Sequence, residues 1–204
     1  MNDHYFTGKP SAKHEHREFT AELRGKMYSF QTDAGVFSKD AVDTGTQILI
    51  DTLALKPGET VLDLGSGYGP IGIVAATLVG HTGHVYMVDV NERACELARR
   101  NLVKNGIQHA QVFVGDGIKA LPENLSFDWV LSNPPIRTGK AVVYPLLVEA
   151  YQALKAGGCL MVVIRTKQGA KSLEAHLRDL AGHCDTIEKK AGFRVLKCCK
   201  PLHT

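Results

Sequence analysis

From residue 60 to residue 180, short apolar segments alternate with longer segments that repeat apolar residues at helical spacing, and this alternation restricts the possible folds most. A short apolar run is typical of a buried strand, and a repeat at helical spacing is typical of an amphipathic helix. Strands that alternate with helices form a mainly parallel sheet with helices on both faces. The sequence therefore predicts an α/β fold built on a doubly wound, mainly parallel sheet.

The sheet is expected to hold seven strands. The last two follow one another directly around Lys190-Ala191-Gly192, which predicts an antiparallel addition at one edge. The predicted strands span residues 60–64, 84–90, 111–114, 128–132, 159–164, 186–188 and 193–199, and the predicted helices span 70–79, 91–105, 141–154 and 169–180.

An N-terminal hairpin and a helix precede this core. Residues 18–24 and 26–32 have the composition of two short strands around Gly25. Residues 40–55 follow a helical pattern that a Lys-Pro-Gly sequence ends.

The size of the chain fits one domain. With 204 residues, 44% of them hydrophobic, it can bury a sizeable core. We expect a single domain over residues 1–204, with an extension over 1–55 and a catalytic core over 56–204.

A glycine-rich turn follows the first core strand, in the sequence Asp63-Leu-Gly65-Ser66-Gly67-Tyr-Gly69. Such a turn lets backbone approach a ligand closely, and the next helix offers free N–H groups. The dinucleotide fingerprint G-x-G-x-x-G has its last glycine where this chain has proline, which disfavours a pyrophosphate. Because the Asp63 carboxylate would attract an ammonium and a sulfonium, the turn favours S-adenosylmethionine over a nicotinamide or flavin cofactor.

Two further aspartates end core strands. Asp89 is expected to accept hydrogen bonds from ribose hydroxyls, with Val90 beside it, although it could merely support the following helix. Asp116, with Gly117 next to it, is expected to accept from an adenine amino group, and an ordinary turn aspartate is the alternative.

The tetrad Asn133-Pro134-Pro135-Ile136 follows the apolar fourth strand of the core. Strand ends of this kind line the ligand crevice of a doubly wound sheet. Two prolines fix the backbone and remove two donors, so the Asn133 side-chain oxygen and the Pro134 carbonyl can both accept from one amino group. Ile136 would pack on a base. The tetrad therefore predicts methyl transfer to an exocyclic amine, although Asn-Pro also opens ordinary turns.

These motifs together resemble the small-domain methyltransferases that modify guanine N2 in small-subunit ribosomal RNA, a Rossmann-like class I fold. The resemblance covers residues 35–165 and rests on four stretches, namely 35–39, 63–72, 88–91 and 133–136. It implies S-adenosylmethionine binding by the glycine turn, Asp89 and Asp116, with Asn133 also lining the cofactor site. It further implies an amine held at Asn133 and Pro134, and RNA as the partner.

The resemblance also concerns the substrate side. It implies that Phe37 and Ser38 help close the pocket, although Phe37 could be a core residue. Many of these enzymes carry Phe and His where this chain has Ile136 and Arg137. The well-known enzymes of this group also have an extra N-terminal domain, for which 204 residues leave no room. Arg137 and Lys140 could contact phosphates instead, or be solvent-exposed charges at a helix start.

Other functions remain open at this point. An adenine-N6 or protein-glutamine methyltransferase uses a similar tetrad, usually with an aromatic residue after the prolines. A non-catalytic S-adenosylmethionine-binding RNA assembly factor would keep the same cofactor residues. An NAD-dependent oxidoreductase is disfavoured by the proline after the glycine turn and by the tetrad.

Composition limits the setting. A net charge of +3 permits a polyanionic partner without requiring one. The five cysteines form no C-x-x-C pair, so we expect free thiols in a cytoplasmic protein. No signal peptide, membrane span or metal is expected, since His14 and His16 lack the spacing of a metal site.

Overall fold

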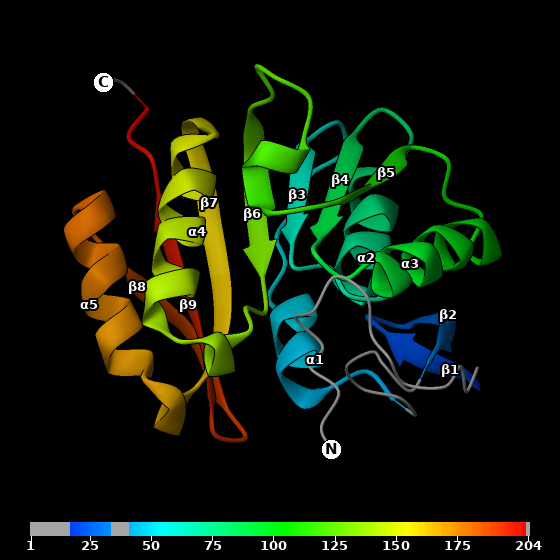
Figure 1. The fold of residues 1–204 in the computed structure, drawn as a ribbon, viewed down its shortest axis with the longest axis horizontal. Coiled ribbons are helices and arrows are strands. Elements are labelled where there is room, and N and C mark those ends of the chain that lie inside the picture. Colours follow the sequence, from blue (N-terminus) through cyan, green and yellow to red (C-terminus); the bar gives the residue numbers. More distant parts are fainter. Residues whose placement is uncertain (1–16, 34–40, 203–204) are drawn as a thin grey trace.

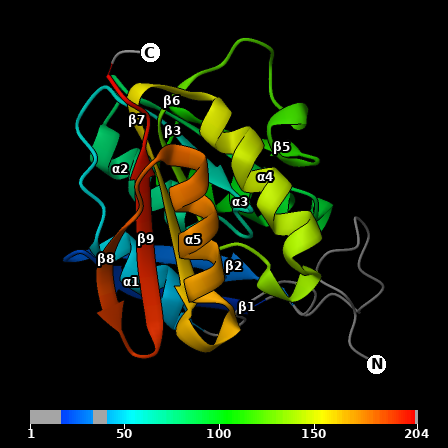
Figure 2. The ribbon, with the colours of Figure 1, turned by 90° about the vertical axis from the view of Figure 1, so that its left-hand side faces the viewer.

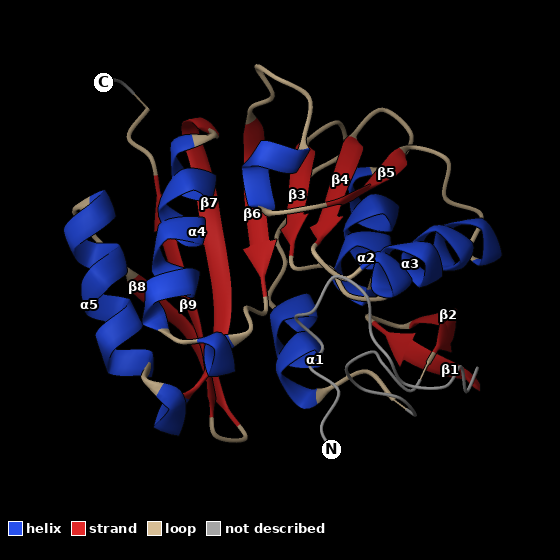
Figure 3. Cartoon of the chain, in the orientation of Figure 1, coloured by secondary structure: helices blue, strands red, loops and turns tan. Residues whose placement is uncertain are grey.

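The computed structural model describes residues 17–33 and 41–202. In these ranges the chain folds around a seven-stranded sheet with the strand order β5-β4-β3-β6-β7-β9-β8 (Figure 1, Figure 3). The strands from β5 to β7 are parallel, and β9 runs antiparallel to both β7 and β8. The predicted fold class is confirmed. The strands are β3 (Thr60–Leu64), β4 (His84–Asp89), β5 (Ala110–Val114), β6 (Phe127–Ser132), β7 (Leu154–Arg165), β8 (Asp185–Lys190) and β9 (Phe193–Cys199).

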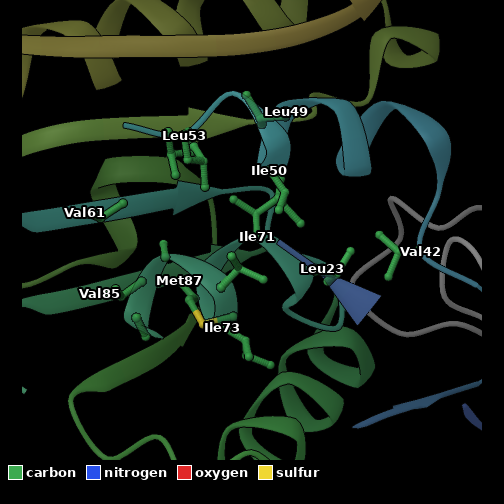
Figure 4. Close-up of a cluster of buried hydrophobic side chains, with 14 of the residues drawn as sticks. Leu23, Val42, Leu49, Ile50, Leu53, Val61, Ile71, Ile73, Val85 and Met87 are labelled. Atoms are coloured by element: carbon green, nitrogen blue, oxygen red, sulfur yellow. The ribbon is translucent and has the colours of Figure 1, made fainter. Parts of the chain in front are cut away.

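Helices cover both faces of the sheet. One core cluster joins α1, α2 and α3 to one face (Figure 4). A second cluster joins α4 and α5 to the other face (Figure 2). Successive strand residues point to opposite faces, so in β3 Val61 enters the first cluster and Leu62 the second. Because both faces are covered, apolar residues follow one another directly along the central strands. The helices are α1 (Thr44–Asp51), α2 (Pro70–Val79), α3 (Glu92–Lys104), α4 (Lys140–Gln152) and α5 (Ala170–Ala181), with short 3₁₀ turns η1 (Gly117–Ala120), η2 (Ile136–Thr138) and η3 (Thr166–Gln168).

The predicted hairpin is present as β1 (Arg17–Leu23) and β2 (Lys26–Thr32). Asn101 of α3 and Asn105, which directly follows this helix, hold the free edge of the hairpin. Asn101 exchanges two hydrogen bonds with the backbone of Gln31, at 2.7 and 3.0 Å, and Asn105 does the same with Ser29, at 3.1 and 2.8 Å. A primary amide can accept and donate at once, so each asparagine replaces one residue of a neighbouring strand.

Three predicted boundaries are wrong by more than two residues. Helix α1 ends at Asp51, before the predicted residue 55. Helix α1 begins at Thr44, later than residue 40, because the Asp43 side chain accepts from the Thr46 N–H and caps it. Strand β7 begins at Leu154, before the predicted residue 159, because Gly157 and Gly158 extend it without adding apolar side chains.

The prediction of free thiols is also wrong in part. Cys159 and Cys199 form a disulfide, because they are register partners on the antiparallel strands β7 and β9, with Cα atoms 4.0 Å apart. They are 40 residues apart in sequence, so spacing alone does not show the pairing. Cys95, Cys184 and Cys198 are free and buried.

None of the helices in the described ranges is long and apolar enough to cross a membrane.

Candidate active site

The two motifs start from neighbouring strand ends. Leu64, the last residue of β3, is the register partner of Ser132, the last residue of β6. The Ser132 hydroxyl donates to the Leu64 carbonyl at 2.8 Å and ties the two ends together. The strand order also reverses at this point, which is where ligands bind in doubly wound sheets. The glycine turn and the Asn-Pro-Pro-Ile tetrad therefore leave the same edge of the sheet side by side.

The glycine turn has the backbone that a close ligand approach requires. Gly65, Gly67 and Gly69 have φ values of 73°, 58° and 99°, a region that favours glycine. The N–H groups of Gly65 and Ser66 donate to the Val88 carbonyl of β4, which fixes the turn against the sheet. Gly69 caps α2 from the N-terminal side, so the turn leads directly into a helix start.

Asp63 is fully buried beneath this helix start. One carboxylate oxygen accepts from the Gly72 N–H at 2.8 Å, and the other has no hydrogen-bond partner among the described residues. Burial raises the pKa of Asp63 to about 7, and the nearby Asp89 carboxylate adds to the increase. The Ser66 hydroxyl is buried and likewise lacks a partner in the described ranges. A cationic group with N–H donors would satisfy the unpaired atoms and favour the ionised carboxylate.

Asp89 connects the glycine turn to α3. Its two oxygens accept from the N–H groups of Gly67 and Asn91, both at 2.8 Å. The Asn91 side chain then caps α3 by accepting from Ala94. Val90, directly after Asp89, is 37% exposed and offers an apolar surface beside the turn. Asp89 therefore holds the glycine turn. It also supports α3 through Asn91, which is the alternative role that the sequence left open for it.

Asp116 and Gly117 lie after β5 on the same edge. Asp116 is exposed and makes no capping hydrogen bond to η1, the short turn that it precedes. Gly117 has a φ of 56°, and a Cβ there would lie 2.5 Å from a Leu146 methyl group. The chain therefore needs glycine at this point.

The tetrad forms a tight turn. The Ile136 N–H donates to the Pro134 carbonyl at 2.8 Å, around Pro135 with φ −74° and ψ 71°, which is an inverse γ-turn. The Pro134 carbonyl is therefore already in use, although a second lone pair is left for another donor. Ile136 is partly buried and packs against the cluster under α4 and α5.

Asn133 is held by helix α1. Its amide nitrogen donates to both carboxylate oxygens of Asp43, at 3.3 and 3.4 Å, and to the Thr46 hydroxyl at 3.0 Å. None of the hydrogen bonds in the described part of the chain uses the Asn133 side-chain oxygen. The side chain thus presents a free acceptor oxygen. The sequence did not indicate the residues that orient it.

The predicted substrate residues are placed only in part. Arg137 and Lys140 are exposed around η2 and the start of α4, and the Lys140 ammonium donates to the Ser172 hydroxyl at 2.8 Å. Phe37 and Ser38 lie outside the described residues, as do His14 and His16.

Sequence reasoning missed Asp43, Thr46 and Asn101. Asn101 is fully buried and donates to the Tyr68 carbonyl at 2.9 Å, so it supports the glycine turn as well as the hairpin. In the described part of the chain, no three His, Cys, Asp or Glu side chains cluster closely enough to hold a metal ion.

The sequence of this chain is similar to one family model and to several known proteins. The model of a family described as "Methyltransferase small domain" matches residues 27–197. The chain is 39% identical over 202 residues to "Uncharacterized protein YbxB" of Bacillus subtilis, covering 98% of this chain and 100% of that one. It is 32% identical over 191 residues to "Ribosomal RNA small subunit methyltransferase C" of Stutzerimonas stutzeri, covering 90% of this chain and 54% of that one.

A solved structure has a similar fold. The Thermus thermophilus 16S rRNA N2 G1207 methyltransferase (RsmC), in complex with AdoMet and guanosine, matches with a TM-score of 0.82 and 29% identity. The match covers 91% of this chain and 50% of that one. The chain thus spans about half the length of these two named ribosomal RNA methyltransferases. The resemblance predicted from the motifs is confirmed.

Proposed function

The chain belongs to the family of the methyltransferase small domain, and we propose that it transfers a methyl group from S-adenosylmethionine to an exocyclic amine of ribosomal RNA. The observation that carries this proposal is the orientation of Asn133, whose amide nitrogen is bound and whose oxygen is free, next to the glycine turn. A free acceptor at this point suits an amine, which offers two N–H donors.

The cofactor prediction is confirmed by the family and by the similarity to a structure that holds AdoMet. The residues proposed to bind it are the glycine turn, Asp63, Ser66, Asp89 with Val90, and Asp116 with Gly117. The unpaired buried oxygens of Asp63 and Ser66 fit a ligand ammonium. When bound, S-adenosylmethionine supplies an electrophilic methyl group on a sulfonium.

Asn133, which is also proposed to line the cofactor site, acts on the amine together with Pro134. The Asn133 oxygen and the second lone pair of the Pro134 carbonyl accept the two amine hydrogens. This fixes the nitrogen and directs its lone pair, which conjugation with the base otherwise withdraws. As the new C–N bond forms, the S–C bond breaks, and the amine releases one proton towards these acceptors and then to solvent. Catalysis by positioning of this kind requires no metal and no strong base.

The proposed target is the N2 amine of guanine. Supporting it are the guanosine in the T. thermophilus structure and the name of that enzyme. A base inside a helix cannot reach Asn133, so the target nucleotide is single-stranded or flipped out of its helix. Arg137 and Lys140 are proposed to contact the RNA phosphates, since both are exposed beside the tetrad.

The test is transfer of radiolabelled methyl to ribosomal RNA, free and in small subunits, from a strain that lacks this gene. Digestion to nucleosides is expected to yield N2-methylguanosine. N6-methyladenosine would move the target to adenine, and label in protein would indicate a glutamine substrate. Binding of S-adenosylmethionine without any transfer would favour the non-catalytic assembly factor.

A variant pair tests the role of Asn133. Asn133→Ala is expected to lower kcat about 100-fold or more, the magnitude typical of removing one positioned polar group, while S-adenosylmethionine still binds. Asn124→Gly is the matched control, because Asn124 is exposed, has a φ of 64° and precedes β6 at the opposite end of the strand. Equal kcat values for Asn133→Ala and wild type would refute the role.

A further inference from the structure

The Asn133 side chain is fixed by two residues from a distant part of the sequence. Asp43 and Thr46 lie 90 and 87 residues before it, at the start of α1. Thr46 is 4% exposed and Asp43 is partly buried, so these contacts are shielded from solvent. Shielding increases the strength of a charge-assisted hydrogen bond.

The orientation of this amide matters because its oxygen accepts hydrogen bonds whereas its nitrogen donates them. A primary amide carries an acceptor oxygen on one side and two N–H donors on the other. If the side chain turned by half a rotation, it would point N–H groups at the N–H groups of the amine. The Asp43 carboxylate only accepts hydrogen bonds, so it binds the nitrogen end and rejects the oxygen end.

We propose that Asp43 and Thr46 are positioning residues that hold Asn133 with its oxygen towards the amine, an inference that rests on the proposed role of Asn133. The Asp43 charge has a second effect. A negative charge at the nitrogen end polarises the amide and makes its oxygen a stronger acceptor. The first turn of α1 therefore acts on the reaction through Asn133.

Helix α1 is anchored well enough to serve this purpose. Ile48, Leu49 and Ile50 are buried at 3%, 0% and 0% exposure in the first core cluster. Figure 4 shows Ile50 beside Ile71 of α2. The start of α1 is thus fixed by the core, and Asn133 is held against a rigid element.

Asp43 also caps α1, so variants must separate positioning from helix stability. Asp43→Ser keeps a capping oxygen but is too short to reach Asn133, whereas Asp43→Asn keeps both the cap and an acceptor without the charge. Thr46→Val removes the hydroxyl at nearly constant volume, and Thr46→Ser restores it. Thr52→Val is the matched control, because it removes a hydroxyl that donates to the Leu49 carbonyl at the far end of α1.

The expected result is a fall in kcat without loss of cofactor affinity. Thr46→Val is expected to lower kcat about tenfold, the equivalent of one hydrogen bond, and Thr46→Ser to recover most of it. Asp43→Ser is expected to cost more than Asp43→Asn, since the latter still binds the amide nitrogen. Thr52→Val is expected to keep the wild-type kcat. S-adenosylmethionine binding is expected to stay the same throughout.

A double-mutant cycle gives the decisive readout. If Thr46 acts only through Asn133, then Thr46→Val has no further effect on kcat in an Asn133→Ala background. A general structural role would lower kcat equally in both backgrounds and would overturn the proposal. So would a wild-type kcat in Thr46→Val.

A second measurement keeps the inference independent of activity. In ¹⁵N-asparagine-labelled protein, the side-chain N–H signals of Asn133, identified by their loss in Asn133→Ala, are expected to exchange slowly with solvent. Thr46→Val and Asp43→Ser are expected to speed this exchange, and an unchanged rate would refute the contact. Absence of methyl transfer by the wild type would reject the proposed function, while the exchange rates would still decide whether Asn133 is held.

Discussion

Asp63 is expected to make the stability of the cofactor-free protein depend on pH. Its side chain is fully buried, with one oxygen bonded to the Gly72 N–H and the other unpaired in the described structure. Burial raises its pKa from 3.8 to about 7. Asp63→Asn keeps an acceptor for Gly72 and removes the titration.

The magnitude follows from the two pKa values. Between 3.8 and about 7 the folded protein binds more protons at Asp63 than the unfolded chain does. The contribution of Asp63 to the free energy of unfolding therefore falls as the pH rises through this window, and this contribution is constant above it. A tenfold change in a protonation constant is worth about 1.4 kcal/mol, so the whole contribution is about 4 kcal/mol.

Urea unfolding measured between pH 4 and pH 8 tests this. Trp129, the single tryptophan of the chain, is buried in β6 and reports unfolding by its fluorescence. The difference in unfolding free energy between wild type and Asp63→Asn is expected to shift by about 4 kcal/mol in favour of the variant as the pH rises. Asp179→Asn, on the exposed side of α5, controls for the loss of one negative charge.

A difference in unfolding free energy between wild type and Asp63→Asn that stays constant with pH would refute the reasoning.

A related prediction concerns the affinity for the cofactor. Since a bound cation favours the ionised carboxylate, binding of S-adenosylmethionine near Asp63 would release a proton below about pH 7, and affinity would rise about tenfold per pH unit there. Cofactor affinity that does not change between pH 5.5 and pH 7 would place Asp63 away from the cation.

Three further changes have defined outcomes. Asp89→Ala is expected to weaken S-adenosylmethionine binding by about 1.5–3 kcal/mol in calorimetry, and an unaltered dissociation constant would remove Asp89 from the site. Asn101→Ala removes three hydrogen bonds of a buried side chain and is expected to cost about 3 kcal/mol in urea unfolding. Val103→Ala, on the 80% exposed position of the same helix, is expected to cost under about 0.5 kcal/mol, and equal losses would contradict the role of Asn101. Gly117→Ala forces φ 56° on alanine and a contact with Leu146, so a loss of about 1–3 kcal/mol is expected in thermal unfolding, and an unchanged Tm would argue against this geometry.

The fold was predictable because its signals are local. The strand over 60–64 and the helix over 70–79 lie where the apolar pattern placed them. The failures occurred where local pattern is silent. The first residues of β7 include two glycines, and the pairing of Cys159 with Cys199 depends on the register of strands 40 residues apart.

The site was predictable to the level of the motifs but not of their support. Parallel strands end at the same edge, so the glycine turn and Asn133 were expected to meet. Asp43 and Asn101 gave no such signal. Aspartate is common at helix starts, and an asparagine within a helix does not by itself indicate which element it contacts. Only the fold shows that Asp43 faces Asn133 and that Asn101 faces the glycine turn.

These hidden contacts have a common origin in the N-terminal elements. The sheet brings the backbones of both motifs to one edge, but backbone placement leaves the conformation of the turn and the direction of the amide open. Asn101 links the β1–β2 hairpin to the Tyr68 carbonyl in the glycine turn, and Asp43 links α1 to Asn133. The hairpin therefore acts on the proposed cofactor side and α1 on the amine side. Perturbing the hairpin should affect mainly cofactor affinity, and perturbing the first turn of α1 should affect mainly kcat, because each element reaches a different half of the site.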